Sequence, residues 1–489
     1  MINFDYDLGV IGGGAAGLTA AAGAAQFGAK TILIEKSDKL GGDCLHFGCV
    51  PSKALIRTAG VWALARRLKE FGLPGLDLVP VDLNKIMERV NSVIEKIQEH
   101  DSPERFRRLG AEVFFGHPQF LDEHSVKVDE TNISAKAWII ATGSRPSIPP
   151  VEGINDVPYW TNENVFSQKI LPASLIILGG GPIGLEMAQA FQRLGSRVTI
   201  VEVTDQILGA EDPDIVKILM GRLEAEGIKI LTGTKAVQVK KKGEKISLSV
   251  VSAKGEGKVK ILEADALFAA TGRRPNVDEL GLESTGVEFS TKGITTDLRM
   301  RTNIAHIYAC GDVNGQFLFT HVAGYEGGVA LSNICLHLPR RADYSKVPWC
   351  TYTDPEVASI GLNETRAKKE GVAYRLLEDS FEENDRALAD AEPLGKIKVL
   401  LTPKGKPLGC QIIGAHAGEL IHEWIPALSG GLRLSTLAGA IHVYPTLSEI
   451  SKKAAASYFT GKILSDRTKK VLRFFFHFKG RTSAAKVEE

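Results

Sequence analysis

The sequence is poor in cysteine and has no long apolar stretch. Cysteine occupies 6 of the 489 positions, namely 44, 49, 310, 335, 350 and 410. So few cysteines in so long a chain do not make a disulfide framework, and we expect a reducing, cytoplasmic environment. No stretch approaches about 18 uncharged apolar residues, so we expect no membrane-spanning helix. The acidic residues Asp5 and Asp7 near the start are the opposite of a secretory signal peptide.

The chain also lacks an excess of charge of either sign. Lysine and arginine total 59, and aspartate and glutamate total 58, which gives a formal net charge of +1. This balance gives no reason to expect a nucleic acid partner. The apolar and charged fractions are those of an ordinary soluble protein, but 489 residues are too many for one hydrophobic core. We therefore expect about three domains.

Two of the few cysteines lie close together in a glycine-rich stretch that runs from position 41 to Lys53. Cys44 and Cys49 are five residues apart, which on a regular helix displaces them by about 7.5 Å along the axis. A disulfide requires Cα atoms within about 7 Å, so the pair needs an irregular helix start or a distorted first turn, which Gly48 permits. A helix N-terminus and the charge of Lys53 both favour a thiolate. We predict a redox-active dithiol rather than two buried small residues.

The N-terminal segment has the pattern of a dinucleotide-binding unit. An apolar strand over 6–11 leads into a glycine-rich turn, an alanine-rich helix to about position 28 and a second strand over 31–35. The glycines allow a tight turn and the close approach of a pyrophosphate, which sits on the helix N-terminus, while a carboxylate at the strand end accepts from a ribose hydroxyl. The residues with these roles are Gly12, Gly14, Gly17 and Glu35.

The same unit recurs later in the chain. A strand over 175–178 leads into a second glycine turn, and a strand over 198–202 ends in an acidic residue. The first glycine and the acidic residue are 23 positions apart in both copies (35 − 12 and 202 − 179). Each copy later reaches an apolar strand that ends in Ala-Thr-Gly, at 141–143 and 270–272. Two nucleotide ligands are therefore expected, and the residues of the second turn are Gly179, Gly181, Gly184 and Glu202.

The rest of the chain contributes a third domain and a tail. A strand over 304–310 ends at Gly311-Asp312, whose carboxylate suits a ribityl or ribose hydroxyl, although Gly-Asp alone is usually a turn. From about 346 the pattern changes to antiparallel strands and short helices, which predicts an α+β domain. The predicted divisions are 1–150 and 280–345 for the first nucleotide domain, 151–279 for the second, 346–467 for the third and 468–489 for the tail.

Two C-terminal segments have distinctive composition. The segment from His442 to Glu449 carries polar groups beside a proline, and as a bare sequence it predicts a helix start with Thr446 as N-cap and Glu449 completing a capping box. The segment 469–479 mixes basic and aromatic residues. For this segment we favour packing against the body of the protein or a second subunit over peripheral contact with an anionic membrane.

These features together resemble the flavoprotein disulfide reductases, which include dihydrolipoamide dehydrogenase, glutathione reductase and mercuric reductase. The resemblance covers about 5–465, because the dithiol stretch, the doubled glycine turn, both Ala-Thr-Gly strands, Cys-Gly-Asp and the late Pro-Thr-x-x-Glu occur in family order. It implies an α/β protein with two Rossmann-like domains, for FAD and a nicotinamide nucleotide, and a C-terminal α+β dimerisation domain. It also implies a homodimer in which the third domain of one subunit completes the active site of the other.

The resemblance assigns roles to individual residues. Cys49 is expected to face the flavin and Cys44 to exchange with substrate, while Lys53 lies near the flavin and pairs with Glu186. Electrons are expected to pass from the nicotinamide through the flavin to the disulfide, and a general acid to protonate the leaving thiolate. Further FAD contacts are expected from Gly42, Lys53, Ala141, Thr142, Gly143, Gly311 and Asp312, and a further NAD contact from Gly272. No resident metal site is expected.

The sequence departs from the family where the general acid and base is expected. Tyr444 stands where reductases of small disulfides have histidine, while Glu449 remains. The pKa of a phenol is about 10, so Tyr444 can donate a proton near neutrality but is a poor base. His442 is the alternative acid and base. Mercuric reductases also use tyrosine here, but they carry a C-terminal cysteine pair. None of the last 79 residues of this chain is cysteine (489 − 410).

The nicotinamide nucleotide is expected to be NAD(H) rather than NADP(H). Glu202 would accept from the free 2′-hydroxyl of NADH and repel a 2′-phosphate. No arginine occurs from 203 to 210 to offset that repulsion.

The sequence leaves three functions open. The favoured one is NAD(P)H-dependent reduction, through FAD and the Cys44–Cys49 disulfide, of a small-molecule or protein disulfide, a thiol-reactive compound or a soft metal. The second is an NADH diaphorase or quinone reductase in which the disulfide is marginal. The third is a redox-sensing binding protein with little turnover.

Overall fold

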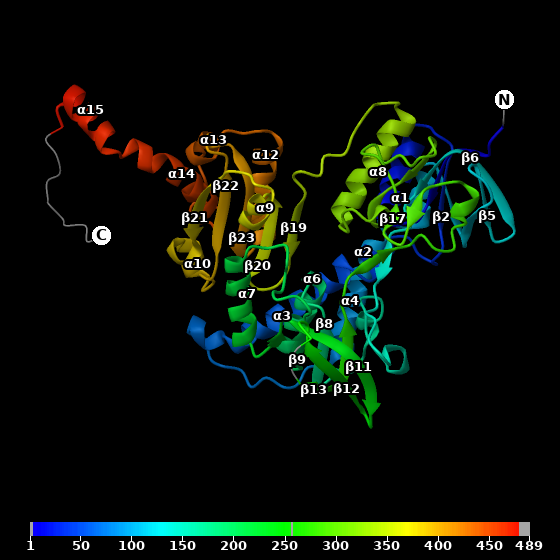
Figure 1. The fold of residues 1–489 in the computed structure, drawn as a ribbon, viewed down its shortest axis with the longest axis horizontal. Helices are drawn as coiled ribbons and strands as arrows, with labels where there is room; N and C mark the ends of the chain where they lie inside the picture. The colour runs from blue at the N-terminus through cyan, green and yellow to red at the C-terminus, as the bar shows by residue number, and fades with distance from the viewer. Residues whose placement is uncertain (1–2, 256–257, 479–489) are drawn as a thin grey trace. The chain divides into compact units, whose positions relative to one another are not determined.

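The computed structural model describes residues 3–255 and 258–478 (Figure 1). These residues form two compact units. The first unit comprises the described parts of Met1–Gly209 and Met220–Tyr344, and the second those of Ala210–Leu219 and Ser345–Glu489. Within the described part of the chain, every helix is too short or too polar to cross a bilayer.

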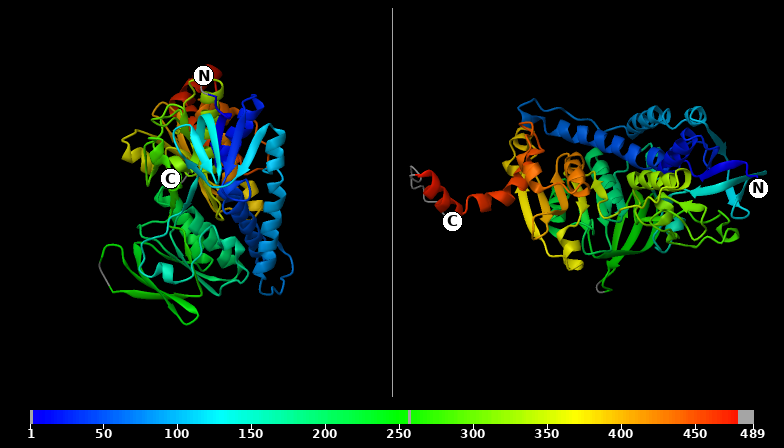
Figure 2. Two further views of the ribbon diagram at one scale, coloured as in Figure 1. Left: turned by 90° about the vertical axis from the view of Figure 1, so that its right-hand side faces the viewer. Right: turned by 90° about the horizontal axis from the view of Figure 1, so that it is seen from above.

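The first unit begins with a parallel sheet in the order β3-β2-β1-β6-β18, which β5 and β4 extend in antiparallel fashion from β6. In the left view of Figure 2 its blue and cyan strands lie side by side. Strand β2 is buried along its whole length, as expected for a parallel strand with elements on both faces. The strands are β1 (Tyr6–Ile11), β2 (Thr31–Glu35), β3 (Ala111–Phe115), β4 (Pro118–Phe120), β5 (Ser125–Val128), β6 (Thr131–Ile140) and β18 (Ile307–Ala309).

The helices of this part of the unit pack closely on one another. Gly327 of α8 lies against α1 so tightly that an added Cβ would be 2.5 Å from the Ala16 oxygen, so only glycine permits this approach. Gly23 of α1 similarly receives the side chain of Leu331. The helices are α1 (Ala15–Gln26), α2 (Gly42–His46), α3 (Cys49–Arg66), α4 (Leu83–Gln98), α5 (Pro103–Arg108) and α8 (Thr320–Cys335).

A second sheet in the same unit repeats the plan of the first. Its parallel strands run in the order β10-β9-β8-β14, and a separate antiparallel sheet has the order β11-β12-β13. The order corresponds to β3-β2-β1-β6 of the first sheet, which confirms two Rossmann-like folds in one chain. The elements are β8 (Ser174–Leu178), α6 (Pro182–Leu194), β9 (Arg197–Val201), β10 (Lys229–Leu231), β11 (Thr234–Lys242), β12 (Lys245–Ser252), β13 (Lys260–Ala264) and β14 (Ala266–Ala269), with short strands β7 (Ser144–Pro146), β15 (Arg273–Pro275), β16 (Phe289–Ser290) and β17 (Gly293–Ile294) elsewhere in the unit. Helix α7 (Pro213–Ala225) begins in the second unit and ends in the first.

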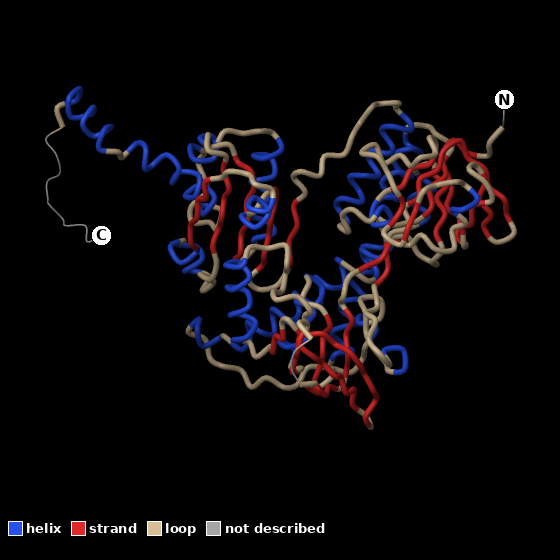
Figure 3. The backbone as a smooth tube through the Cα atoms, in the orientation of Figure 1, coloured by secondary structure: helices blue, strands red, loops and turns tan. Residues whose placement is uncertain are grey.

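The second unit is built on an antiparallel sheet in the order β19-β20-β23-β22-β21, drawn in red with blue helices around it in Figure 3. Trp424 is fully buried in its core. This confirms the predicted C-terminal α+β fold. The elements are β19 (Pro348–Thr351), β20 (Glu356–Gly361), α9 (Glu364–Lys369), β21 (Arg375–Ser380), α10 (Asp385–Ala389), β22 (Lys396–Leu401), β23 (Pro407–Gly414), α11 (Ala417–Leu420), α12 (Trp424–Ser429), α13 (Leu434–Gly439), α14 (Glu449–Ile463) and α15 (Asp466–Phe476).

A buried lysine ties the start of α7 to this second sheet. Lys398 on β22 is 1% exposed and lies 2.8 Å from Asp212, 2.9 Å from Asp214 and 2.7 Å from Glu364. Burial alone would lower the pKa of Lys398, but the three carboxylates raise it above its usual value. The Lys398 ammonium therefore stays charged and neutralises part of the charge of the three carboxylates.

The C-terminal region departs from the sequence prediction at Thr446. The predicted capping box is wrong, because α14 begins at Glu449 and the Thr446 hydroxyl donates to the Val443 oxygen instead. The tail segment forms α15, none of whose residues is buried, and Lys479 lies outside the described residues. Contact of this helix with a second subunit or a membrane stays a prediction.

Candidate functional site

The cysteine pair lies where two helices meet. Cys44 is in the short helix α2, and Cys49 is the first residue of α3. The chain turns between them at Gly48, where an added Cβ would be 2.9 Å from a carboxylate oxygen of Asp43. A break between two helices, rather than a distorted turn of one helix, therefore brings the cysteines together. Cys49 stands at the N-terminus of α3, where the helix dipole favours a thiolate.

The two thiols are free and share a hydrogen bond. This bond from Cys44, the Thr320 hydroxyl and the charge of Lys53 together lower the pKa of Cys49 to about 6, against the opposing effect of burial. The Thr320 oxygen lies 3.4 Å from the Cys49 sulfur. The same bond and burial raise the pKa of Cys44. The interaction therefore favours the proton on Cys44 and the negative charge on Cys49.

A lysine–glutamate pair joins the dithiol helix to the second nucleotide-binding fold. Lys53 on α3 lies 2.9 Å from Glu186 on α6. The Glu186 side chain is 5% exposed, whereas that of Lys53 is 37% exposed. A carboxylate this deeply buried requires a partner, so the pair holds the ammonium one helical turn from Cys49.

The first glycine turn fits a pyrophosphate. Helix α1 has Gly14 as N-cap, no side-chain cap and no acidic residue in its first turn, so its N-terminal amides lack a side-chain acceptor. The space beside Gly14 is open, since the nearest atom to an added Cβ would be the Gly42 Cα at 4.0 Å. Gly12, by contrast, has φ +107° and packs against the Ala141 oxygen. These features match the P–O⁻ groups of a dinucleotide such as FAD.

An acidic residue fixes the end of β2 beside this turn. Glu35 is buried and accepts from the Gly13 amide at 2.6 Å and from the Ser37 amide and hydroxyl at 2.8 and 2.6 Å. The carboxylate is therefore held rigidly at the place where a ribose hydroxyl is expected.

A second acidic residue follows β18. Asp312 accepts from the Ser144 hydroxyl at 2.6 Å and lies 3.8 Å from Arg273. Burial raises the pKa of Asp312, and the Ser144 hydrogen bond opposes this rise. Arg273 also lies 3.0 Å from Asp43 of the dithiol segment. Through Arg273, the predicted ribityl-binding carboxylate is connected with α2, the helix that carries Asp43 and Cys44.

The second glycine turn has the same construction as the first. Gly181 is the N-cap of α6, with no acidic residue in the first turn and no atom within 4 Å of an added Cβ. Glu202 accepts from the Gly180 amide at 2.6 Å and from the Thr204 amide and hydroxyl at 2.7 Å each. Gly272 has φ +113° and open space beside it. This turn too fits a dinucleotide.

The predicted acid–base residues belong to the second unit. Tyr444 is 67% exposed, and its hydroxyl donates to Asp385 at 2.7 Å. That hydrogen bond raises the pKa of Tyr444. His442 is paired instead with Glu423, with Nε2 and Oε1 2.7 Å apart. Glu449 is the first residue of α14.

The structure brings several predicted residues together. Cys44, Cys49, Lys53 and Glu186 form one cluster in the first unit, whereas Tyr444 belongs to the other unit. Most of the remaining predicted residues of the nucleotide sites follow strand ends, namely Thr142, Gly143, Gly179 and Gly311, whereas Gly17, Gly42 and Gly184 lie in the first turns of α1, α2 and α6.

Sequence reasoning missed three side chains that contact the predicted site residues. Thr320 contacts Cys49, and Ser144 and Arg273 contact Asp312. Ser144 and Arg273 each directly follow an Ala-Thr-Gly strand end, which is a signal that could have identified them. Thr320 has no such signal, because 271 positions separate it from Cys49.

Comparisons with known proteins agree on the family. A family model described as pyridine nucleotide-disulphide oxidoreductase matches residues 6–327, and one for the dimerisation domain of the same family matches 347–455. The chain is 36% identical over 468 residues to a dihydrolipoamide dehydrogenase of Chaetomium thermophilum, covering 94% of this chain and 92% of that protein. It is 32% identical over 456 residues to a mercuric reductase of Staphylococcus aureus, covering 93% and 82%.

A solved structure agrees as well. The HOCl-induced flavoprotein disulfide reductase RclA from Escherichia coli, in its Cu(II) complex, superposes with a TM-score of 0.83 at 26% identity. The match covers 93% of this chain and 100% of that one. Relatives of this family use FAD and a pyridine nucleotide, which the two glycine turns fit. The chain therefore belongs to the pyridine nucleotide-disulphide oxidoreductases, FAD-dependent enzymes built from two nucleotide-binding folds and a dimerisation domain.

Proposed function

We propose that this protein is an NADH-dependent flavoprotein reductase that passes electrons through Cys44 and Cys49 to a disulfide, a thiol-reactive compound or a soft metal ion. The observation that carries the proposal is the hydrogen-bonded thiol pair, in which the pKa of Cys49 is lowered to about 6 beside Thr320 and Lys53. When bound, FAD supplies hydride acceptance from the nicotinamide and delivery of an electron pair to the disulfide.

The two cysteines take different parts in the proposed reaction. The Cys49 thiolate takes the proton of Cys44 through the hydrogen bond that joins them. The Cys44 thiolate then attacks one sulfur of a substrate disulfide, whose S–S bond breaks, and the departing thiolate takes up a proton. Cys49 next gives up that proton to the second departing thiolate as it attacks the Cys44 sulfur, so the second thiol is released and the Cys44–Cys49 disulfide is restored.

The proposed acid–base residue, Tyr444, favours the reduction of a disulfide over the oxidation of a dithiol. Reduction requires a proton donor for the leaving thiolate, whereas oxidation of a dithiol requires a base. The hydrogen bond to Asp385 raises the pKa of Tyr444, so the phenol stays protonated and suits the donor role. His442 is paired with Glu423, which leaves Tyr444 as the proposed donor and Glu449 as its neighbour in the same segment. In the homodimer that the dimerisation domain suggests, these residues would complete the partner subunit's dithiol site.

Relatives support soft metal ions as one class of acceptor. Mercuric reductases are among the similar proteins, and RclA has been solved as a Cu(II) complex. A dithiolate of Cys44 and Cys49 is itself a soft ligand pair. The C-terminal 79 residues contain no further cysteine to deliver such an ion (489 − 410), so we propose that the metal reaches the dithiol directly.

The proposed nicotinamide nucleotide is NADH. Glu202 is fixed by the Gly180 amide and by Thr204 at the end of β9, where it would accept from a 2′-hydroxyl. A 2′-phosphate at the same place would be repelled.

An anaerobic titration of the purified yellow protein with NADH tests the proposal. In the wild type we expect a long-wavelength charge-transfer band after two electrons, because the Cys49 thiolate would lie against a bound flavin. Cys49→Ser is the matched variant and should lack the band. If the flavin bleaches identically in both, the dithiol takes no part, and a diaphorase or a sensing role replaces the proposal.

The direction of turnover provides a second test. We expect NADH-driven reduction of a disulfide or of Cu(II) to exceed NAD⁺-driven oxidation of dihydrolipoamide at the same pH. Tyr444→His should increase the oxidation of dihydrolipoamide by supplying a base, and Tyr444→Phe should slow disulfide reduction. Equal rates in both directions for the wild type would contradict the role given to Tyr444.

A further inference from the structure

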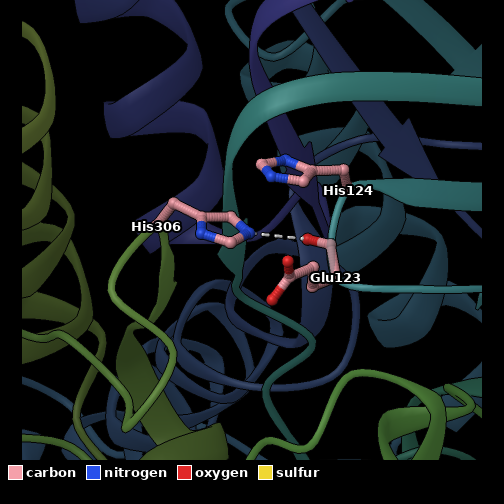
Figure 4. Close-up of side chains that lie close together, drawn as sticks. All are labelled: Glu123, His124 and His306. Atoms are coloured by element: carbon pink, nitrogen blue, oxygen red, sulfur yellow. Dashed lines mark hydrogen bonds between the residues drawn. The ribbon is translucent and has the colours of Figure 1, made fainter. Parts of the chain in front are cut away.

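The histidine cluster on the first unit is a packing contact rather than a ligand site. Glu123, His124 and His306 lie close together there (Figure 4). The two imidazoles stack with centroids 4.0 Å apart and planes 8° from parallel, so a single metal ion cannot lie in both ring planes. His306 Nε2 also donates to the Glu123 main-chain oxygen at 3.0 Å. The cluster is therefore explained by its own ring stacking and hydrogen bond.

Helix α15, which follows α14 in the second unit, has a basic face and an apolar face. Side chains three and four residues apart share one face of a helix. By this spacing the polar face consists of Asp466, Lys469, Lys470 and Arg473. The apolar face consists of Thr468, Val471, Leu472, Phe475 and Phe476. The helix is therefore amphipathic, and cations make up most of its polar side.

The helix forms without covering its apolar face. The Ser465 hydroxyl accepts from the Thr468 main-chain N–H at 3.2 Å and caps the first turn. In Figure 1 α15 leads away from the strands of the second unit, and none of its residues is buried. Phe475 is 67% exposed and Phe476 64% exposed. Of the two partners favoured from the sequence, the body of the protein therefore does not bury this helix, and an external partner is required to cover it.

The positive charge of the chain is concentrated on this helix. It carries four basic residues and one acidic residue, a formal charge of +3, whereas the whole chain carries +1. All other residues together therefore carry −2 (1 − 3). Among the described residues, Lys469 pairs with Asp466 at 3.2 Å, but Lys470 and Arg473 form no ion pair. The basic face is thus available to an anionic partner.

An anionic lipid surface fits this helix better than a second copy of the chain does. Lysine is depleted in the buried cores of protein interfaces, and two copies of a helix of charge +3 repel each other. The family model for the dimerisation domain ends at 455, before α15 begins. Helices that lie in a membrane interface, by contrast, combine lysine and arginine on one face with phenylalanine and leucine on the other.

We propose that α15 binds the surface of an anionic lipid membrane. The helix lies in the plane of the interface, with Phe475 and Phe476 among the upper parts of the acyl chains and Lys470 and Arg473 against the lipid phosphates. The attachment is peripheral, because a helix of 11 residues is too short to span the hydrocarbon core.

Flotation of the full-length, FAD-loaded protein with lipid vesicles tests the proposal. Vesicles of phosphatidylcholine alone are compared with vesicles that also contain phosphatidylserine. We expect the protein to bind the anionic vesicles about tenfold more tightly or better, and added salt to weaken this binding. Lys470→Gln/Arg473→Gln should weaken it by about twentyfold, because each charge near an anionic surface contributes about fivefold. Phe475→Ser/Phe476→Ser should weaken it by about tenfold or more with the charge unchanged.

Two matched controls separate the helix from its charge and its composition. Lys240→Gln/Lys241→Gln removes two exposed lysines of β11 and should leave vesicle binding unchanged. Lys470→Leu/Leu472→Lys keeps the composition and net charge of α15 but places a lysine on its apolar face, so it should weaken binding. Retention of the flavin spectrum in each variant shows that the protein is folded.

The proposal is overturned if the wild type binds anionic vesicles no better than neutral ones, a result that depends on no variant. It is also overturned if the Lys240→Gln/Lys241→Gln control weakens binding as much as the α15 charge variant, because the attraction would then be unspecific. Sedimentation without lipid tests the second copy as the partner. If Phe475→Ser/Phe476→Ser converts a dimer into monomers there, the apolar face belongs to a subunit interface and the proposal fails.

Discussion

The two glycine turns of the first unit are nearly identical in construction. Gly12 has φ +107° and Gly179 φ +108°, and each packs against the oxygen of an Ala-Thr-Gly alanine. In each copy the acidic residue at the strand end accepts from the second glycine at 2.6 Å, Glu35 from Gly13 and Glu202 from Gly180. The same local sequence has therefore produced the same turn geometry twice.

The two nucleotide-binding folds differ in the segment that follows the second strand. In each fold a residue of this segment first donates a hydrogen bond back to the glycine turn. Gly41 donates to the Gly13 oxygen at 2.8 Å, and Leu208 donates to the Gly180 oxygen at 3.0 Å. After Gly41 the chain enters α2 and α3 with the dithiol, whereas after Leu208 it passes into the second unit. In the proposed function the turn determines where a nucleotide binds, and the segment after the closing hydrogen bond determines the chemistry beside it.

The largest difference between the two glycine turns should appear when a carboxylate is placed at the N-terminus of α1 or of α6. Gly14→Asp and Gly181→Asp are both free of strain and would be good N-caps, but each carboxylate would repel a pyrophosphate. We expect Gly14→Asp to yield colourless protein without FAD. We expect Gly181→Asp to stay yellow and to raise KM for NADH by about a hundredfold. Flavin absorbance and steady-state kinetics measure the two effects, and Gly→Asn at each site is the uncharged control.

The next largest effect should come from the dithiol, which only the first copy carries. We expect Cys44→Ser and Cys49→Ser to lower NADH-driven disulfide reduction by about a thousandfold. NADH-driven quinone reduction should persist, because both nucleotide turns are intact. Disulfide turnover within a few-fold of wild type in Cys49→Ser would contradict this division of roles.

The matched acidic residues should differ in their effect on nucleotide choice. We expect Glu202→Gln to raise the ratio of kcat/KM for NADPH to that for NADH by about tenfold, because the charge facing a 2′-phosphate is lost. Glu35→Gln should leave that ratio unchanged and weaken FAD retention instead. The same initial-rate assay with both nucleotides measures the first effect, and an unchanged ratio in Glu202→Gln would exclude Glu202 as the discriminating residue.

The pH dependence of Cys49 tests the electrostatics of the dithiol segment. Since the pKa of Cys49 is lowered to about 6, its alkylation by iodoacetamide in the reduced enzyme should increase as pH rises through 6. The charge of Lys53 lowers this pKa, so Lys53→Met should move the inflection to higher pH and slow alkylation at pH 6 several-fold. An inflection near the ordinary thiol value in wild type would contradict the proposed thiolate.

The smallest expected effect concerns Thr320. Its hydroxyl lies 3.4 Å from the Cys49 sulfur and also lowers the pKa of Cys49. Thr320→Val keeps the shape of the side chain and removes the donor, so we expect a smaller upward shift than for Lys53→Met and about a twofold slower alkylation at pH 6. A shift as large as that of Lys53→Met would mean that the hydrogen bond outweighs the charge.

Much of the fold follows from local patterns in the sequence. The strand–glycine turn–helix–strand units were predictable because their apolar runs, glycines and acidic residues lie within 23 positions of one another. The cysteine pair was predictable for the same reason. The capping box at Thr446 was not predicted correctly, because the Thr446 hydroxyl bonds to Val443 and α14 begins later. A residue pattern alone does not fix which of two local hydrogen bonds forms.

The sequence by itself determined the family, the two nucleotide turns and the identity of the reactive thiols, since each depends on residues that are neighbours along the chain. Only the tertiary structure decided the partners that tune these groups. Thr320 meets Cys49 and Arg273 meets Asp43 across long separations in sequence, whereas the Lys53–Glu186 pair had already been implied by the family resemblance. Such contacts arise because distant segments bury their apolar faces together, and the polar groups carried with them must then satisfy one another.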